Sequence, residues 1–292
     1  MTSALPHPIK HRLQQTLAQW PRWQCAKPLQ RPPEFLQILS GGISNFSALV
    51  GDDQRFVVRI DGVNPELNGL NRQAEWRALH SAYRAGIAPC PRYFNPDLGT
   101  LVCDYLEPEP SANETVSQVA TLLAAIHSLP ARHHRMSLGE RITRYEQQRA
   151  LRSHTSSALD QCRQPIRDLL KTSEQRQTTP VLCHNDLLRA NRIVHRGSLW
   201  AIDWEYCAMG DPLYDLAVVI EGDSLPRQDA DLLVKHYLGR QPDQSEREML
   251  HHYRYLYRYL EILWYLAQPE PLMDTHLLYE KTAVLLEELP RG

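Results

Sequence analysis

The chain has 292 residues, of which 42% are hydrophobic and 23% charged, and its formal net charge is −2. This length is enough to bury a sizeable core in two lobes, and the composition is ordinary for a globular protein. The near-neutral charge gives no electrostatic reason to expect binding to nucleic acid or to an anionic membrane. No apolar run has the length of a signal peptide or a membrane span, so a cytoplasmic protein with reduced cysteines is expected.

The first hundred residues alternate between helical and strand-like patterns. A leading helix is expected at residues 7–20, followed by a Pro-rich connector through Pro33. Strands are expected at 35–39, 46–50 and 56–60, with a Gly-containing turn that predicts a hairpin. Helix 68–85 follows and ends at Gly86, and segments 92–94 and 101–106 form a second predicted hairpin.

After Pro110 helical periodicity dominates, beginning with a predicted helix at 116–127 and broken by a strand pair around residues 180–205. The predicted organisation is a leading segment (1–34), a β-rich lobe (35–104), a hinge (105–111) and a helix-rich lobe (112–292). The fold class expected from this pattern is α+β.

A glycine-containing loop follows the first predicted strand. Gly41 and Gly42 allow backbone N–H groups to approach anionic oxygens, and Ser44 and Asn45 add side-chain donors. The simpler interpretation of these glycines is a tight hairpin, and for Gly-Gly alone that interpretation is the better one.

Arg59 closes the strand FVVRI, and Glu75 lies on the next predicted helix. The two side chains could form a bidentate pair that holds the cation beside the glycine loop, within reach of phosphate oxygens. The alternative is two solvated surface charges. The order of glycine loop, basic strand residue, helical Glu and hinge is typical of kinases.

The segment VLCHNDLLRANRIV contains the pattern H-x-D-x-x-x-x-N, and the following AIDWEYCAMGDPLYDLA opens with the acidic pair Asp203 and Glu205. Asp186 is expected to orient or accept the proton of a substrate hydroxyl, while His184 braces the loop. Asn191 and Asp203 offer the oxygen ligands that Mg²⁺ needs against nucleotide phosphates. This composite pattern predicts phosphoryl transfer.

The pattern D-P-x-x-D-L-A supplies two acids for which structural roles are expected. Asp211 is placed in a turn before Pro212, and Asp215 caps a helix or braces the catalytic loop.

A helix rich in aromatic residues is predicted at 251–268, where Tyr257, Leu260 and Trp264 share one face. Aromatic faces bind quaternary ammonium groups by cation–π attraction, which makes Trp264 and Tyr257 candidate walls of a substrate site. Core packing is the alternative, and it is expected for most of these rings.

These motifs resemble the aminoglycoside phosphotransferase/choline kinase superfamily over roughly residues 36–268. The matching pieces are, in order, GGISN, FVVR, the Glu75 helix, GIAP, CDYLEP, IHSLP, HNDLLRAN and IDWEYCAMGDPLYDLA. Arg59 at the position of the kinase lysine, IDWEY and LWYLAQ are similar to the bacterial choline kinase and thiamine kinase branch.

The resemblance implies a protein-kinase-like two-lobe fold, ATP with Mg²⁺, and transfer to the hydroxyl of a small molecule. It makes Asp186 the catalytic base, Asn191 and Asp203 the metal ligands, and Arg59 the phosphate-binding cation. The hinge residues Asp104, Tyr105 and Leu106 are then expected to contact the nucleotide.

The acceptor is the least defined part of the prediction. Glu205 and Glu221 are candidate acceptor-binding acids, and the sequence leaves open whether either one contacts the metal or the substrate. Glu221 is one residue short of the usual family spacing after D-L-A, so Asp223 stays a candidate too.

A small cationic alcohol, choline- or thiamine-like, is expected. The alternatives are an aminoglycoside or amino-sugar phosphotransferase and a catalytically inactive nucleotide-binding protein. A monomer or a homodimer is expected.

Overall fold

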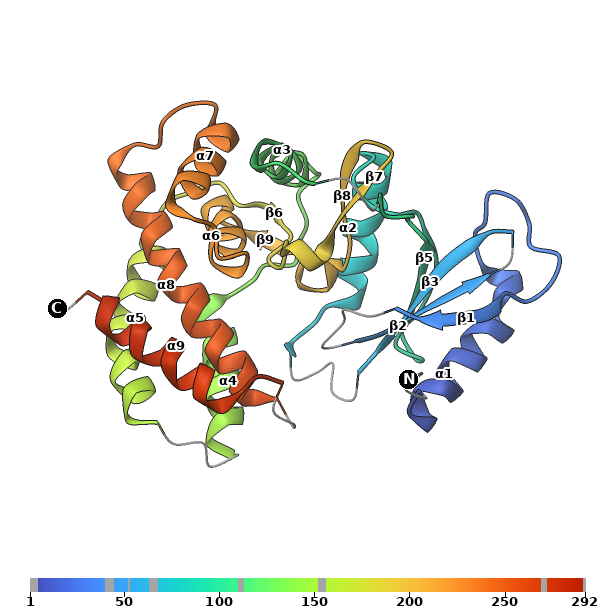
Figure 1. Ribbon diagram of the computed structural model, residues 1–292, viewed down its shortest axis with the longest axis horizontal. Coiled ribbons are helices and arrows are strands. Elements are labelled where there is room, and N and C mark those ends of the chain that lie inside the picture. The colour runs from blue at the N-terminus through green and yellow to red at the C-terminus, as the bar shows by residue number, and fades with distance from the viewer. Residues whose placement is uncertain are drawn as a thin grey trace. The chain divides into compact units, whose positions relative to one another are not determined.

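The computed structural model describes residues 5–39, 45–51, 53–62, 68–109, 113–151, 156–268 and 272–290. It divides into two compact units (Figure 1). The first unit comprises Met1–Glu114 and Ala190–Tyr206, and the second comprises Thr115–Arg189 and Cys207–Gly292. The sequence predicted one helix-rich lobe from residue 112 onward, whereas the structure groups 190–206 with the N-terminal residues. The hinge at 105–111 stays a prediction.

A five-stranded antiparallel sheet forms the centre of the first unit, in the order β1-β2-β3-β5-β4. Its strands are β1 (Glu34–Ile38), β2 (Asn45–Gly51), β3 (Arg55–Asp61), β4 (Pro91–Asn95) and β5 (Thr100–Asp104). The antiparallel pairs β1–β2 and β4–β5 confirm the two predicted hairpins. Arg59 lies opposite Ser47 on one side and Leu101 on the other, so it occupies the middle of the sheet.

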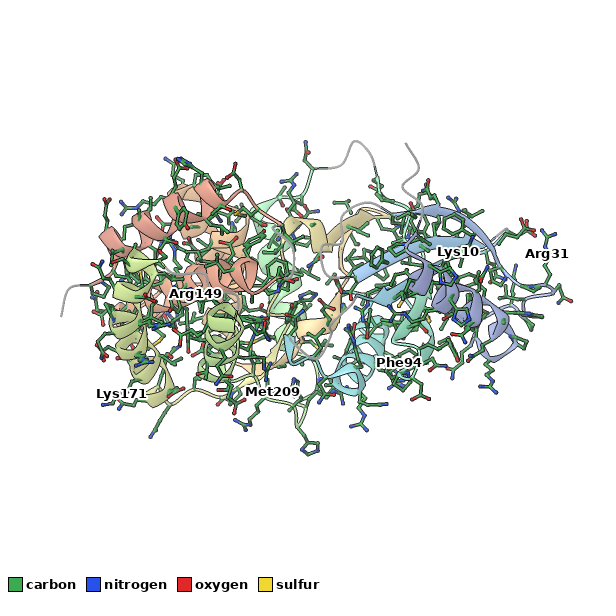
Figure 2. The ribbon with its side chains drawn as sticks, turned by 90° about the horizontal axis from the view of Figure 1, so that it is seen from below. Lys10, Arg31, Phe94, Arg149, Lys171 and Met209 are labelled. Atoms are coloured by element: carbon green, nitrogen blue, oxygen red, sulfur yellow. The ribbon has the colours of Figure 1, made fainter. Side chains whose placement is uncertain are left out.

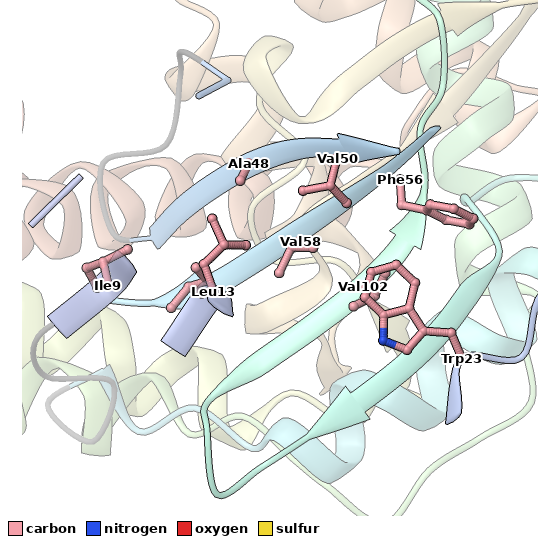
Figure 3. Close-up of a cluster of buried hydrophobic side chains, with 9 residues drawn as sticks. Ile9, Leu13, Trp23, Ala48, Val50, Phe56, Val58 and Val102 are labelled. Atoms are coloured by element: carbon pink, nitrogen blue, oxygen red, sulfur yellow. The ribbon is translucent and has the colours of Figure 1, made fainter. Parts of the chain in front are cut away.

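One face of this sheet is covered by α1 (His7–Ala18), as Figure 3 shows. Because side chains alternate along a strand, Phe56, Val58 and Ile60 of β3 all point to this face. They pack with Ile9 and Leu13 of α1. Further members of the cluster are Trp23, Ala48, Val50 and Val102. The predicted leading helix is therefore a structural part of the first unit.

The opposite face of the sheet carries the alternate residues Val57 and Arg59, together with α2 (Arg72–Arg84). The helix begins at Arg72, four residues later than predicted, because the Asn71 side chain accepts a 2.9 Å hydrogen bond from Ala74 N–H. A side chain at this position satisfies an N–H group that lacks a helical partner. The cap places Arg72 and Glu75 on the first turn of the helix.

The segment 190–206 adds a further hairpin to the first unit, a separate two-stranded sheet formed by β7 (Arg192–His195) and β8 (Ser198–Ala201). A 3₁₀ turn at Trp204–Tyr206 follows it and packs against α2. The backbone N–H of Ala201 donates to the carbonyl of Ile87 at 2.8 Å, which ties the end of β8 to the residues after α2.

The second unit is mainly helical. Its helix α8 (Gln244–Ala267) packs against α4 (Leu138–Leu151), α5 (Ser157–Gln175), α6 (Pro212–Gly222) and α9 (Thr275–Glu288). A separate pair, α3 (Val116–His127) and α7 (Arg227–Leu238), also packs together. The short strands β6 (Val181–Cys183) and β9 (Ala208–Gly210) pair antiparallel. The strand pair predicted around 180–205 is thus part of two separate two-stranded sheets.

The side chains drawn in Figure 2 belong to a β-rich first unit, with Phe94 on β4, and a helical second unit, with Arg149 on α4. The α+β class predicted from the sequence is confirmed. Each of the six cysteines lies within the described residues and carries a thiol rather than a disulfide. A search of the described residues reveals no helix with the length and apolar character of a membrane span.

Candidate active site

Arg59 and Glu75 form a buried bidentate ion pair in the first unit. Arg59 Nη2 lies 2.7 Å from Glu75 Oε2, and Nη1 lies 2.5 Å from Oε1. The residues are only 8% and 2% exposed, so the interpretation as solvated surface charges is wrong. The predicted pairing is confirmed, and it fixes the direction of the guanidinium.

Arg59 also donates from Nη1 to Asp203 Oδ1 at 2.7 Å. Burial lowers the pKa of the Arg59 guanidinium, but Glu75 and then Asp203 raise it well above its ordinary range. The net direction is upward, so Arg59 is a permanent cation. A buried cation held by two carboxylates presents a fixed positive charge to whatever enters the site.

Asp203 lies just after β8 and adopts a left-handed backbone conformation, with φ of 59°. This conformation is uncommon for a residue with a side chain and is concentrated at functional sites. The preceding Ile202 N–H donates to the carbonyl of Asn191 at 2.9 Å, which joins the two predicted metal-ligand segments. Burial raises the pKa of the Asp203 carboxyl, and Arg59 opposes that rise.

Asn191 and Asp203 both line a cavity of about 310 Å³ within the first unit. Arg59 and Glu75 contribute to its polar part, and Leu101 and Cys103 to its apolar part. The amide and carboxylate oxygens are hard donors of the kind that Mg²⁺ prefers, and 27% of the Asp203 side chain is exposed. These residues fit a divalent cation, although their role as metal ligands stays a prediction.

The predicted hinge residues Asp104, Tyr105 and Leu106 line the same cavity. The Asp104 carboxylate accepts two 2.7 Å hydrogen bonds, from Nε and Nη2 of Arg92 on β4. The backbone N–H of Tyr105 donates to the carbonyl of Arg55 at 3.0 Å. The segment is therefore rigidly attached to the sheet. Of the predicted glycine loop, Gly41, Gly42 and Ser44 lie outside the described residues.

Asn45 and Glu205 are joined by a hydrogen bond of 2.7 Å from Asn45 Nδ2 to Glu205 Oε2. Glu205 is 3% exposed and also accepts a 3.1 Å hydrogen bond from Arg72 Nη1. Burial, and then the neighbouring Asp203, raise the pKa of the Glu205 carboxyl. The carboxylate predicted to bind the acceptor is thus engaged by two groups of the first unit.

Arg72 was not singled out in the sequence, and its position explains why. It bonds to Asp61 and Glu205, residues 11 and 133 positions away, and to Glu75 within its own helix. The only local signal is the three-residue spacing from Arg72 to Glu75, which is typical of helix-surface ion pairs.

The predicted catalytic loop begins in the second unit, where Asp215 of α6 braces it. The backbone N–H groups of His184 and Asn185 donate to the two Asp215 carboxylate oxygens at 2.8 and 2.7 Å. His127 Nε2 lies 3.0 Å from Asp215 Oδ2. The expected brace is confirmed. It holds Asn185 in a left-handed conformation, with φ of 62°, immediately before the half-buried Asp186.

Burial raises the pKa of the Asp215 carboxyl. The hydrogen bond and charge of His127 and the contacts of His184 lower it by a larger amount, so the pKa is below its ordinary value. Asp215 is therefore ionised. His184 is fully buried, which is consistent with a bracing role. Asp211, the other predicted structural acid, caps α6 by accepting a 2.9 Å hydrogen bond from Leu213 N–H.

His127, Cys183 and Asp215 place one potential metal-binding atom each within 4.8 Å of one another. Burial, followed by Asp215 and Asp211, raises the pKa of Cys183 well above its ordinary value, so the thiol is neutral. A metal requires the thiolate, and both Asp215 oxygens already accept hydrogen bonds. This cluster is a hydrogen-bonded brace.

The aromatic helix α8 presents Tyr257 near the catalytic loop. Burial raises the pKa of Tyr257 well above its ordinary value, and Glu261 and Asp186 raise it further. The same two acids act on Tyr265, after burial, in the same direction. Trp264 is half-buried and packs edge-to-face on Tyr265, with ring centroids 4.9 Å apart. Tyr253, Tyr255, Tyr257 and Tyr259 are buried, so the core interpretation holds for these four rings, and Tyr257 is the most exposed of them at 9%.

The other predicted acceptor-binding acid, Glu221, forms ion pairs with two arginines of α8. Arg254 Nε donates to Glu221 Oε1, and Arg258 Nε lies 3.8 Å from Oε2. Its charge is therefore compensated inside the second unit, which weakens the case for it as a substrate ligand. Asp223 accepts a 2.8 Å hydrogen bond from Arg189 N–H at the end of the catalytic loop.

Comparison with known proteins identifies the family of the chain. The model of the Phosphotransferase enzyme family matches residues 36–263, and the chain belongs to that family. It is a small-molecule kinase.

Two relatives and one solved structure illustrate the similarity. Protein LicA of Haemophilus influenzae is 26% identical over 249 residues, which cover 77% of this chain and 70% of LicA. The thiamine kinase of Shigella boydii is 31% identical over 216 residues, or 71% of this chain and 73% of that protein. The structure of choline kinase LicA from Streptococcus pneumoniae superposes with a TM-score of 0.71 at 23% identity, covering 87% and 94% of the two chains. The protein-kinase-like fold is confirmed.

Proposed function

We propose that the protein transfers the γ-phosphate of ATP to the hydroxyl of a small cationic alcohol, choline- or thiamine-like. The observation that carries the proposal is the buried Arg59, bonded to both Glu75 and Asp203 beside the cavity of the first unit. A fixed cation next to oxygen ligands is what binding of a metal–triphosphate requires.

In this proposal the nucleotide occupies the cavity of the first unit. Leu101, Cys103 and Leu106 supply an apolar surface suited to a flat base, and Arg59 neutralises phosphate oxygens. Mg²⁺, when bound by Asn191 and Asp203, neutralises further negative charge on the phosphates. Glu75 prevents Arg59 from turning away, so the cation is oriented before the nucleotide arrives.

Asp186 of the second unit acts on the acceptor. Its carboxylate takes the proton of the hydroxyl, whose oxygen attacks the γ-phosphorus while the bond to the β–γ bridging oxygen breaks. ADP then leaves with the electron pair of that bond. The Asp215 brace fixes the backbone on which Asp186 is carried. Positioning is the main contribution that a protein makes to phosphoryl transfer.

A cationic acceptor is supported by the surroundings of Asp186. Tyr257 and Tyr265 lie in the field of Glu261 and Asp186, which favours positive charge, and the half-buried Tyr265 and Trp264 are aromatic rings of the kind that make cation–π contacts. Glu261 is itself paired with Lys281 at 2.8 Å, so this region lacks the excess of free acids that suits a polycation. The similarity to a thiamine kinase agrees with a cationic alcohol.

The test is ATP consumption with a panel of choline, ethanolamine, thiamine, amino sugars and aminoglycosides, in Mg²⁺ and in EDTA. We expect turnover with a cationic alcohol in the presence of Mg²⁺ and no turnover in EDTA. Preference for an aminoglycoside would show that the proposed class of acceptor is wrong, while the assignment as a kinase would hold. Calorimetry that finds ATP bound equally well in Mg²⁺ and EDTA would contradict the metal assignment, and ATP binding without turnover on any acceptor would indicate an inactive nucleotide-binding protein.

A further inference from the structure

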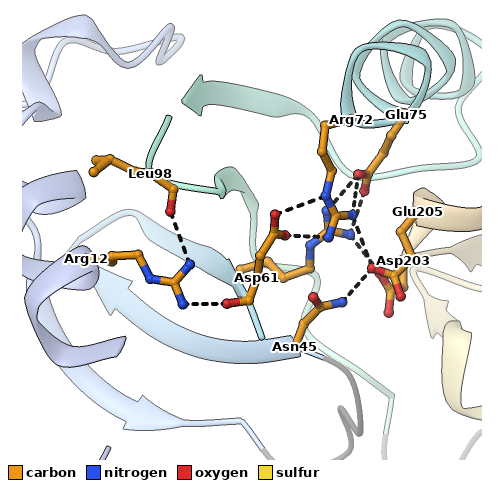
Figure 4. A network of polar contacts seen from close by, with 9 residues as sticks. Arg12, Asn45, Asp61, Arg72, Glu75, Leu98, Asp203 and Glu205 are labelled. Carbon is orange, nitrogen blue, oxygen red and sulfur yellow. Dashed lines mark hydrogen bonds and ion pairs between the residues drawn. The ribbon is translucent and has the colours of Figure 1, made fainter. Parts of the chain in front are cut away.

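Arg72, on the first turn of α2, bonds to three carboxylates of the first unit (Figure 4). Its Nε and Nη2 groups both donate to Asp61, the former at 3.1 Å to Oδ2. Its Nη1 donates to Glu75 Oε2 at 2.9 Å and to Glu205 Oε2 at 3.1 Å. All three nitrogens of the guanidinium are therefore used.

The shared nitrogen Nη1 connects the two parts of the nucleotide site. Glu75 is the carboxylate that orients Arg59, and Glu205 lies two residues after Asp203. Arg72 therefore links Glu75 on α2 to the segment Asp203–Glu205, so that neither can move without the other. Arg59 closes the ring, because it bonds to both Glu75 and Asp203.

Asp61 is the fixed anchor of this arrangement. It ends β3, and its backbone carbonyl accepts a 2.6 Å hydrogen bond from Arg12 Nη2 of α1. Gly99, with φ of 58°, passes so close that a Cβ there would lie 2.9 Å from Asp61 Oδ2. The absence of a side chain at Gly99 leaves the Asp61 carboxylate free to face Arg72.

The charges explain why a second guanidinium is needed. Within this group of side chains, four carboxylates surround two guanidiniums, and Arg72 is only 13% exposed. The carboxylates are those of Asp61, Glu75, Asp203 and Glu205. Without Arg72, Glu205 would be a buried acid that keeps, among the hydrogen bonds of the described residues, the one from Asn45, and it lies two residues from the predicted metal ligand. A buried carboxylate that loses its cation turns toward another cation, here Arg59, and this would draw the segment 203–205 out of position.

We infer that Arg72 is a positioning residue for the nucleotide–metal site. It links Glu205 to Glu75 and thereby holds Asp203 and Arg59 at fixed positions relative to each other. The inference rests on the proposed function, since it assigns Asp203 to the metal and Arg59 to the phosphates. It predicts that loss of Arg72 acts on binding of the metal–nucleotide and leaves binding of the acceptor intact.

The test compares wild type with Arg72→Met, Arg72→Lys, Glu205→Gln and the Arg72→Met/Glu205→Gln double variant. Arg84→Met, which alters an exposed arginine on the same helix, is the matched control. Calorimetry with a non-hydrolysable ATP analogue in Mg²⁺ and in EDTA gives the affinity, and kinetics give the Mg²⁺ concentration for half-maximal activity and both KM values. Thermal melts accompany each variant.

Arg72→Met should weaken Mg²⁺-dependent binding of the analogue by about 10- to 100-fold, the usual effect of removing a residue that orients a metal ligand. The acceptor KM should not change. Arg72→Lys should recover part of the loss, because it keeps the charge but lacks the fork. The affinity loss of the double variant should be smaller than the product of the two single losses, because both single changes remove the same bond between Arg72 and Glu205.

The inference is overturned if Arg72→Met binds the Mg²⁺–analogue as wild type does, or if its loss is matched by Arg84→Met. It is also overturned if the Arg72 and Glu205 effects multiply independently. Should Arg72→Met fail to fold, Arg72→Lys decides by the same readouts. Absence of turnover in the wild-type protein contradicts the proposed function alone, because the calorimetric comparison still decides the role of Arg72.

Discussion

Asp215 holds Asn185 in a left-handed backbone conformation by accepting a 2.7 Å hydrogen bond from its N–H group. Because Asn185 directly precedes Asp186, this bond determines the direction in which the chain enters the predicted catalytic residue. We expect Asp215→Asn to lower kcat and to destabilise the fold by about 2 kcal/mol, the usual range for hydrogen bonds to a charged group. Asp231→Asn, at an exposed position of α7, is the control.

The pKa of Asp215 is lowered on folding, so its ionised form stabilises the native state. This stabilisation is complete above the ordinary carboxyl pKa of about 3.9. It is lost as the pH falls through the lower pKa that Asp215 has in the folded protein. The difference in Tm between wild type and Asp215→Asn should therefore be constant above about pH 5 and shrink below about pH 4. A difference that grows on acidification would contradict the assigned charge state.

Asp186→Asn should reduce kcat by about a hundredfold or more and leave the affinity for ATP nearly unchanged, because the loss concerns a group that acts on the acceptor hydroxyl. Stopped assays for turnover and calorimetry for ATP separate the two effects. A variant with near-normal kcat on the best acceptor would remove Asp186 from the role of base.

Arg59→Ala should weaken ATP binding and slow transfer, and Arg59→Lys should do so less because it keeps the charge. Glu75→Gln should reproduce part of the defect, since Arg59 then loses the carboxylate that orients it. A double-mutant cycle on ATP affinity measures their coupling. Strict additivity of the two changes would be unexpected for side chains 2.5–2.7 Å apart.

Trp264→Ala should raise the KM for a cationic acceptor by tens of fold, since one desolvated cation–π contact contributes about 2 kcal/mol. Trp264→Phe should be milder. Tyr279→Ala, at an exposed aromatic position of α9, serves as the control. If Trp264→Ala lowers the Tm and leaves the acceptor KM unchanged, the ring belongs to the core.

Gly222→Ala tests the surroundings of Tyr257, because Gly222 lies against Tyr257 and against Leu188, two residues after Asp186. A Cβ at Gly222 would overlap Leu188 Cδ2 and lie 2.9 Å from the Tyr257 hydroxyl oxygen, so both side chains must shift. We expect a higher KM for the acceptor with unchanged ATP affinity, measured by steady-state kinetics and calorimetry. An effect on ATP affinity alone would place these side chains outside the acceptor site.

The sequence predicts best those features that depend on local periodicity. Alternation along β3 places Val58 in the core and Arg59 on the opposite face, and the helical pattern of α2 brings Glu75 toward that face. The pairing of Arg59 with Glu75 was therefore predictable. The grouping of segment 190–206 with the N-terminal residues could not be predicted, because compactness depends on contacts distant in sequence, such as the one between Ala201 and Ile87.

Ion pairs between distant segments could not be predicted. Arg72 and Glu205 are 133 residues apart, and nothing in the local pattern indicates that they meet. Glu221 lies near the expected place of a substrate acid after D-L-A, one residue short of the usual spacing, and α8 brings Arg254 and Arg258 against it. Charged side chains are assigned least reliably from sequence, because any of them finds its partner only when the chain is folded.

The leading helix α1 has a practical consequence for work with shortened forms of the protein. Arg12 reaches the end of β3, Thr16 Oγ1 donates to Thr100 Oγ1 at 3.0 Å, and Ile9 and Leu13 cover one sheet face. A chain that starts at Glu34 would expose Val50, Val58 and the other residues of that face to water, and such an uncovered apolar sheet invites self-association. Affinity tags and fusion partners therefore belong at the other end of the polypeptide, and trimming the first thirty residues to aid crystallisation should be avoided.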